Sequence, residues 1–330
     1  MTLTKIDKWK SMRGKFSRLI WPNGMPQLIP SIALNQSVGY ITYDNVNCVQ
    51  LDVLTCTLDL DGNYGKVHLL HPKPEKALNR CVIVHGGHSQ DYYSTGSVVA
   101  TNGNNFNMVQ ALLVNGYHVL GCVMPFMASY SPDIIAANME LHSHQNFYFY
   151  EQVVGSLDKH PLVYFLEDKI QALNYCDNNF DFKSYDMVGL SGGGWSTVMV
   201  AALDRRIRRS YPVFGGLPFD LRAILVSQGY TAYGDYEQKQ DRPWWPDLED
   251  KEEHIYALGC LEPGRRQMQI VGDQDTSFPV INLHSQVTAY KDYVQSFVPE
   301  GNYDVFIDDY ATVHQFSELA ITKIIDDLAA

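Results

Sequence analysis

The chain has 330 residues, of which 45% are hydrophobic and 19% charged, and its formal net charge is −12. This composition excludes a disordered chain, predicts a large buried core and argues against a general nucleic-acid-binding surface. No run approaches the roughly 18 consecutive apolar residues of a membrane-spanning helix, so no integral membrane segment is expected. The six cysteines are scattered and form no CxxC pair. They predict buried reduced thiols rather than disulfides or a structural zinc site.

The first twenty residues form a basic segment, with six lysines and arginines against one aspartate. Neither an apolar core nor a small-residue cleavage site follows, so no secretory signal is predicted and a cytoplasmic location is expected. Ile6, Trp9, Phe16 and Leu19 fall on one face if this segment is a helix. We expect the helix to pack on the acidic body of the protein. A basic helix that lies on a membrane or a partner is the alternative.

Prolines at positions 22, 26 and 30 separate this segment, residues 1–30, from the main domain, residues 31–330. Antiparallel strands are predicted to begin the domain, over 38–43, 49–58 and 66–70. Strands and helices alternate after them, which predicts an α/β fold with a doubly wound, mostly parallel sheet covered on both faces. These further strands span 81–85, 118–123, 187–190, 209–214, 267–271 and 303–307, and the helices span 105–115, 162–177, 195–203, 281–297 and 315–328.

Two long stretches interrupt the alternation, at about 125–161 and 217–264. Both are rich in aromatic residues and lack a clear period, which is typical of functional lids or insertions in a compact domain. We therefore interpret both as cap segments inserted over one end of the sheet.

The most informative motif is Gly189-Leu190-Ser191-Gly192-Gly193, which follows an apolar strand and precedes a helix rich in valine, methionine and alanine. Small neighbours allow a tight strand-to-helix turn, and this turn lifts the serine hydroxyl out of the sheet. The helix N-terminus supplies positive potential for a developing oxyanion. The pattern predicts Ser191 as a nucleophile. A glycine-rich turn that only begins an ordinary helix is the alternative.

With this motif in place, the chain resembles the α/β-hydrolase superfamily over residues 38–330. Ser191, an acid and His314 follow one another in the superfamily's chain order of nucleophile, acid and base. The segment 162–216 is most similar to the acetyl-xylan-esterase and dienelactone-hydrolase branch. In that branch a helix precedes the nucleophile turn and an Ala-Leu-Asp-Arg-Arg type sequence, here 202–206, follows it.

The motif His85-Gly86-Gly87-His88 follows an earlier strand, where the superfamily keeps its second oxyanion donor. The resemblance implies that the tetrahedral oxyanion is bound by the amide of Gly192 together with the amide of either Gly87 or His88.

Position identifies the base and the acid. His314 is the one of eleven histidines that lies between the last predicted strand and the last predicted helix, where a base can reach the serine hydroxyl. The acid, which orients the imidazole, is expected after the strand 267–271, where Asp273 and Asp275 are available. The superfamily's Gly-x-x-Asp spacing falls on Asp275. Asp273 is expected to bond backbone amides of the loop.

The remaining candidates line the site or lie outside it. Trp195, Trp244 and Trp245 are candidate substrate-binding residues, although Trp195 is expected to pack beneath the pocket and the other two could equally pack the cap 217–264 onto the domain. The arginine-rich run 205–209 could bind an anionic substrate. The simpler prediction is that it complements a helix C-terminus and pairs with local carboxylates.

These residues imply a serine hydrolase that cleaves carboxylic esters through an acyl-enzyme on Ser191, with Asp275 orienting His314. A small ester substrate is the expected partner, and no metal or organic cofactor is required. Cap segments would narrow the pocket, which favours short acyl groups such as acetyl. A serine peptidase of the prolyl-oligopeptidase type and an acyltransferase are the enzyme alternatives. A hydrolase-like binding module is the alternative outside enzymes.

Overall fold

The computed structural model describes residues 3–36, 48–58, 64–88, 98–99, 105–125, 162–230 and 253–330. Within these ranges, nine strands form one sheet in the order β1-β2-β3-β7-β4-β8-β9-β10-β11, and β5 pairs with β6 in a small hairpin. The strands are β1 Ser31–Ala33, β2 Cys48–Thr57, β3 Tyr64–Pro72, β4 Arg80–His85, β5 Val98–Val99, β6 Asn105–Phe106, β7 His118–Cys122, β8 Ser184–Leu190, β9 Ile207–Val213, β10 Arg266–Gly272 and β11 Tyr303–Asp308.

The sheet is antiparallel at its N-terminal edge and parallel elsewhere. β1, β2 and β3 pair antiparallel, as do β3 and β7, whereas β7, β4, β8, β9, β10 and β11 run parallel. Every residue of the central strand β8 is buried, as a strand covered on both faces requires. The predicted sheet architecture is therefore confirmed. The predicted strand 38–43 lies outside the described residues.

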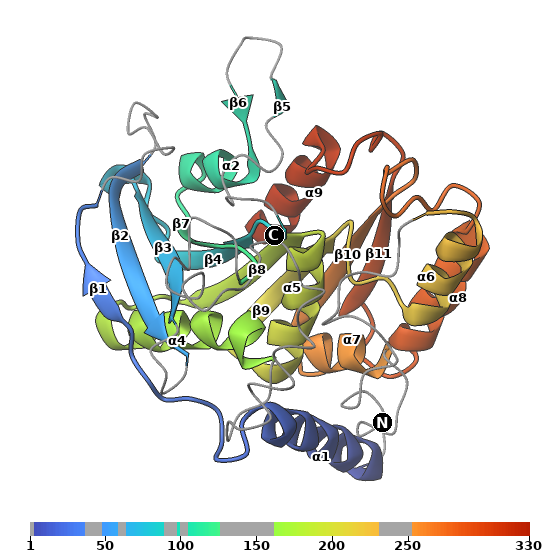
Figure 1. Ribbon diagram of the computed structural model, residues 1–330, viewed down its shortest axis with the longest axis horizontal. Coiled ribbons are helices and arrows are strands. Elements are labelled where there is room, and N and C mark those ends of the chain that lie inside the picture. Colours follow the sequence, from blue (N-terminus) through green and yellow to red (C-terminus); the bar gives the residue numbers. More distant parts are fainter. Residues whose placement is uncertain are drawn as a thin grey trace, which may run out of the picture.

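Helices cover both faces of the sheet (Figure 1). α2 and α9 pack on one face, and α4, α5 and α7 pack on the other. The helices are α1 Leu3–Ile20, α2 Met108–Val114, α4 Val163–Asn179, α5 Gly192–Leu203, α6 Phe219–Ser227, α7 Glu253–Cys260, α8 His284–Gln295 and α9 Glu318–Ala329, with a 3-10 turn η1 at Pro74–Lys76.

The ends of the stretch 217–264 differ from the predicted cap segment. They form α6 and α7, and α7 packs against α5 as part of the domain body. All residues of α7 after Glu253 are buried, so the helix belongs to the core of the domain. Residues 231–252 of this stretch and 126–161 of the other lie outside the described residues. Their interpretation as caps stays a prediction.

The basic N-terminal segment forms α1, which packs beneath α5 and α7 (Figure 1). Trp9, Met12, Phe16 and Ile20 are buried, whereas Leu19 is only half-buried. These four residues recur at helical spacing and make the apolar stripe that docks the helix. The prediction that the basic segment packs on the body is therefore confirmed, with Met12 and Ile20 on the buried face.

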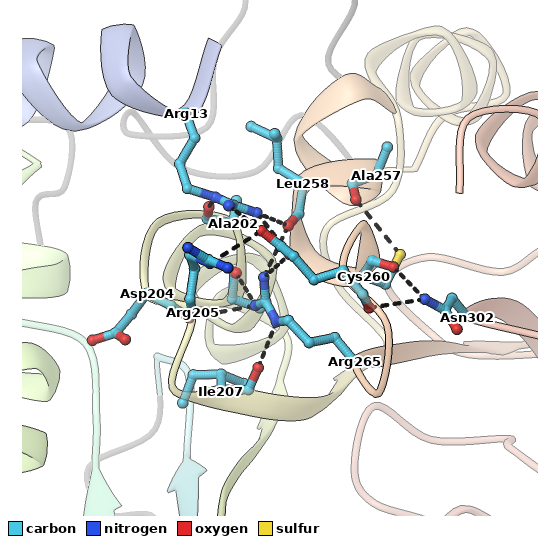
Figure 2. Close-up of polar contacts among 12 residues, drawn as sticks. Arg13, Ala202, Asp204, Arg205, Ile207, Ala257, Leu258, Cys260, Arg265 and Asn302 are labelled. Carbon is cyan, nitrogen blue, oxygen red and sulfur yellow. Dashed lines mark hydrogen bonds and ion pairs between the residues drawn. The ribbon is translucent and has the colours of Figure 1, made fainter. Parts of the chain in front are cut away.

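Two buried arginines join α1 to the body at the C-terminal ends of α5 and α7 (Figure 2). Arg13 Nε donates to Ala202 O at 2.8 Å, and its Nη2 donates to Leu258 O at 2.7 Å. Arg265 Nη1 donates to the same Leu258 oxygen at 3.2 Å. Glu262 forms ion pairs with both arginines. The C-terminus of a helix has carbonyl oxygens without intrahelical donors and carries partial negative charge. The guanidinium groups donate to these oxygens and their positive charge offsets the negative one.

The run 205–209 makes the local contacts that were predicted for it. Arg206 pairs with Asp204 at 2.6 Å and Asp177 at 2.7 Å, and Arg205 pairs with Glu262 at 3.2 Å. Arginines that already neutralise nearby carboxylates attract an anionic substrate only weakly.

All six cysteines are buried and free, as predicted. Among the described helices, none combines the length and the hydrophobicity that a membrane span requires.

Candidate active site

Ser191 occupies the turn between β8 and α5. Its backbone angles are φ 58° and ψ −123°, a conformation that costs a residue with a Cβ about 1–3 kcal/mol. The turn is held by Ser191 N–H, which donates to Val213 O at 2.9 Å, and by Ser191 O, which accepts from Gly194 N–H at 2.8 Å. Although Ser191 stands at the N-cap position, its hydroxyl makes no capping bond to α5. An ordinary helix-capping serine is therefore excluded.

Glycines surround this turn because other backbone segments approach it closely. A Cβ at Gly215 would overlap the carbonyl oxygen of Ser191, and a Cβ at Gly193 would overlap the carbonyl oxygen of His85. The small residues that the motif predicts are thus required by contact with neighbouring loops as well as by the bend itself.

Asp275 and His314 form a hydrogen-bonded pair. His314 Nδ1 lies 3.0 and 2.9 Å from the two carboxylate oxygens of Asp275. The Asp275 side chain is fully buried and also accepts the amides of Ser277 and Phe278, at 2.9 and 2.6 Å. The Phe278 ring lies 5.6 Å from the imidazole. These contacts hold the carboxylate and the ring in one geometry and leave Nε2 as the nitrogen that can act as a base.

Asp273 has a different role from the predicted one. Its carboxylate contacts His284 Nε2 at 2.6 Å, and it is Asp275 that bonds the backbone amides of this loop. The amides converge on Asp275 because the loop turns back immediately after that residue, where Val280 N–H reaches Gly272 O at 3.1 Å.

The fold brings the three predicted catalytic residues to one edge of the sheet. Ser191 follows β8, Asp275 follows β10 and His314 follows β11. These strands belong to one parallel set, so their carboxyl ends lie side by side (Figure 1). Backbone bonds fix the loops to each other. Phe214 N–H, for example, donates to Ile270 O at 2.9 Å.

The loop after β4 lies against the Ser191 turn. Gly86 N–H donates to Cys122 O at 2.9 Å, and Gly87 O accepts from Met124 N–H at 3.0 Å. Gly87 has a φ of 65°. A Cβ at this position would lie 3.2 Å from Ser191 Cβ and would press on the backbone before it. Only glycine fits both the conformation and the space.

The side chains of His88 and Met124 lie over Gly192, the first residue of α5. A Cβ at Gly192 would approach His88 Nδ1 to 2.7 Å and Met124 Cε to 2.6 Å. Met124 is fully buried, whereas His88 is half-buried. The structure thus brings Gly87, His88 and Gly192 together beside Ser191. Their role as an oxyanion hole stays a prediction.

Comparisons with known proteins test the fold. No protein-family model matches the chain, and no curated protein is significantly similar to its sequence. The acetyl xylan esterase of Paenibacillus sp. R4 superposes with a TM-score of 0.57 at 14% identity, over 99% of each chain. Acetyl xylan esterase 1 of Thermoanaerobacterium sp. JW/SL YS485 gives 0.54 at 18% identity, over 99% of this chain and 98% of that one. A Pyrococcus furiosus esterase gives 0.52 at 14% identity, over 92% and 98%.

The chain has the α/β-hydrolase fold. The similarity spans nearly the whole chain, including the antiparallel strands at the N-terminal edge of the sheet. The resemblance that the motif and its partners indicated is confirmed for the fold.

Of the three tryptophan candidates, the described residues include only Trp195, on the first turn of α5. Trp195 is 1% exposed and packs edge-to-face on Phe165 with 5.9 Å between ring centroids. It lies in the core beneath the turn, where it was expected to pack, and a role in substrate binding stays a prediction. Trp244 and Trp245 lie outside the described residues.

Met124 and Phe278 contact the site but were missed by sequence reasoning. Met124 follows β7 by two residues, and Phe278 follows the acid by three. The position of Met124 just past a parallel strand's carboxyl end was a usable signal. For Phe278 no local pattern distinguishes a ring against the catalytic edge from an ordinary loop residue.

Proposed function

We propose that this chain is a serine hydrolase that cleaves carboxylic esters. The observation that carries the proposal is the strained Ser191 turn at the sheet edge that also holds the Asp275–His314 pair. A non-glycine residue kept at φ 58° is a feature of functional sites, because the surrounding structure must compensate the strain. The activities named for the similar structures, two acetyl xylan esterases and an esterase, support the same reaction class.

In the proposed mechanism, His314 Nε2 removes the proton of the Ser191 hydroxyl while Ser191 Oγ attacks the ester carbonyl carbon. Asp275 accepts the Nδ1–H bond and stabilises the imidazolium that forms. Gly192 N–H, at the positive end of α5, binds the oxyanion. The imidazolium then gives its proton to the leaving alcohol as the carbon–oxygen bond breaks, leaving an acyl-enzyme. Water, deprotonated by His314, then attacks the acyl carbon. The imidazolium returns that proton to Ser191 Oγ as the bond between Oγ and the acyl carbon breaks and the carboxylic acid leaves.

We further propose short acyl groups as substrates. The acyl substituent of a bound ester lies within a few ångströms of the carbonyl carbon and therefore beside Gly192. The side chains of Met124 and His88 occupy the space over Gly192, so little volume is left there for a long chain. The alcohol is released toward His314, whose side chain is 21% exposed.

Active-site labelling tests the reaction class. The wild-type protein should react covalently with a fluorophosphonate probe, and Ser191→Ala should not, because only an activated serine attacks the phosphorus. Ser227 offers a matched control, because Ser227→Ala removes a hydroxyl that donates to Ile224 O of its own helix α6 and should leave labelling intact. Equal labelling of the wild type and Ser191→Ala, or no labelling of a folded wild type, would contradict the proposal.

A further inference from the structure

His85 closes β4, and its side chain is fully buried. Its ring nitrogen Nδ1 lies 3.1 Å from the amide nitrogen of Gly87 and accepts that N–H. A ring nitrogen that accepts a hydrogen bond carries a lone pair, so the proton of the neutral imidazole is on Nε2. Burial, together with the nearby Lys169, lowers the pKa of His85 well below its usual range. The ring therefore keeps its accepting nitrogen at neutral pH.

This bond determines where the Gly87 amide points. Gly87 N–H is held by His85 Nδ1, and Gly87 O is held by Met124 N–H at 3.0 Å, so the peptide groups on both sides of Gly87 are fixed. Gly87 N–H faces the His85 ring. An amide that donates to a buried ring is not directed at an oxyanion bound to Ser191.

We propose that His85 is a positioning residue: it holds the Gly87 amide and thereby assigns the second oxyanion donor to the amide of His88. The proposal rests on the proposed ester hydrolysis. It chooses between the two alternatives that the sequence leaves open, because the Gly87 amide donates to the His85 ring.

Two substitutions at position 85 distinguish the effect of losing the hydrogen bond from the effect of changing the packing of the side chain. His85→Asn places a carbonyl oxygen on Cγ, where histidine carries Nδ1, and retains an acceptor for Gly87 N–H. His85→Phe keeps a ring of similar size and removes the acceptor. We expect His85→Phe to lower kcat for p-nitrophenyl acetate by about 100-fold, the effect of misplacing one oxyanion donor, with KM within about threefold. His85→Asn should stay within about fivefold of the wild-type kcat.

The same bond predicts which amides respond to a bound oxyanion. After phosphonylation of Ser191, the phosphoryl oxygen occupies the position of the oxyanion. In protein labelled with 15N at glycine and histidine, the amide protons of Gly192 and His88 should move downfield, and that of Gly87 should not. This measurement uses the wild-type protein, so it remains decisive if His85→Phe does not fold.

Three results would overturn the assignment in an enzyme that hydrolyses esters. They are equal losses of kcat in His85→Asn and His85→Phe, an unchanged kcat in His85→Phe, and a downfield shift of the Gly87 amide on phosphonylation. If the folded wild type reacts with neither the ester nor the probe, the proposed function itself fails and the donor assignment is overturned with it. The two failures are thus distinguishable.

Discussion

At the scale of single residues, the two aspartates after β10 show how environment divides similar side chains. Asp275 is 1% exposed and its carboxylate bonds His314 and two backbone amides. Asp273, two residues earlier, contacts His284, whose side chain is 52% exposed. A carboxylate that orients a base must be held from several sides, since its work is to fix the tautomer and direction of the imidazole.

Asp275→Asn should therefore lower kcat far more than Asp273→Asn. We expect a loss of about 10³- to 10⁴-fold for Asp275→Asn, because the amide favours the wrong imidazole tautomer. Asp273→Asn removes a contact to an exposed histidine and should cost less than about tenfold. Steady-state hydrolysis of p-nitrophenyl acetate by both variants, with melting curves to verify folding, measures this. A larger loss in Asp273→Asn would show that the acid is the other residue.

At the scale of elements, α1 is fastened by charge as well as by its apolar stripe. Burial alone would raise the pKa of Glu262, but its bonds to the Arg13 and Arg265 guanidinium groups outweigh this and lower it to about 2. A depressed carboxyl pKa contributes stability that is fully present above the ordinary value and is lost as the pH falls toward 2. The ion pairs therefore hold α1 throughout the neutral and mildly acidic range.

Replacement of Arg13 tests this attachment. Arg13→Ala removes the donor to Ala202 O of α5, one of the two donors to Leu258 O of α7 and one ion pair of Glu262. It should lower the free energy of unfolding by about 2–4 kcal/mol. Arg18 lies one turn and a half further along α1 and is exposed. Arg18→Ala is thus a matched control and should change stability by less than about 0.5 kcal/mol. Urea unfolding measures both. Equal effects would mean that the apolar stripe alone docks the helix.

A second polar cluster joins β2, β3 and β7, in the antiparallel part of the sheet. Asp52 Oδ2 lies 3.0 Å from His71 Nε2, and His71 Nδ1 lies 3.1 Å from His118 Nδ1. Two ring nitrogens share a hydrogen bond only when one is protonated and the other is not. Burial lowers the pKa of His118 to about 4 and also lowers that of His71, although Asp52 opposes the shift at His71.

Acid should therefore weaken the fold through this cluster. An unfolded histidine binds its proton near pH 6.5, whereas His118 in the folded chain does so near 4. The unfolded state takes up more protons between these values, so stability falls as the pH drops through them. His118→Gln should reduce this slope without abolishing it, because burial also lowers the pKa of His68 to about 4. Urea midpoints at about pH 7 and 4.5 measure it, and His284→Gln, an exposed-histidine control, should retain the wild-type slope. An unchanged slope in His118→Gln would contradict the prediction.

At the scale of the whole molecule, the parallel strands gather the reactive loops at one edge of the sheet, and α1 adds a further layer on the helices of one face (Figure 1). The stretch 126–161 follows β7. The stretch 231–252 lies between α6, which follows β9, and α7. Sequence places them after strands whose carboxyl ends form the catalytic edge. Insertions at such positions are typically lids, so the prediction that these two stretches narrow the site stands.

The acyl-chain profile tests this narrowing. For p-nitrophenyl esters, kcat/KM should peak at about two to four acyl carbons, since the space over Gly192 is taken by Met124 and His88. Met124→Ala should move the peak to longer chains by removing a thioether from that space. Leu112→Ala, a buried control on α2, should leave the profile unchanged. A wild-type peak at about eight carbons or more would contradict the short-acyl proposal.

By itself, the sequence determined the features that depend on local periods and spacings. Alternating apolar strands and helices predicted the doubly wound sheet, and the glycines around Ser191 predicted a turn that few other residues could form. The order of Ser191, Asp275 and His314 predicted their meeting at one edge, because parallel strands end together.

Tertiary structure alone decided the features that depend on contacts between distant segments. The sequence places α7 inside a predicted cap segment, and only the folded chain shows that it packs against α5. For Phe278, only the folded chain shows that the ring faces His314. The Gly87 amide donates to a ring two residues away, and Gly87 O accepts from Met124 N–H in the loop after β7. Hydrogen bonds of this kind are set by three-dimensional proximity, and residue spacing does not encode them.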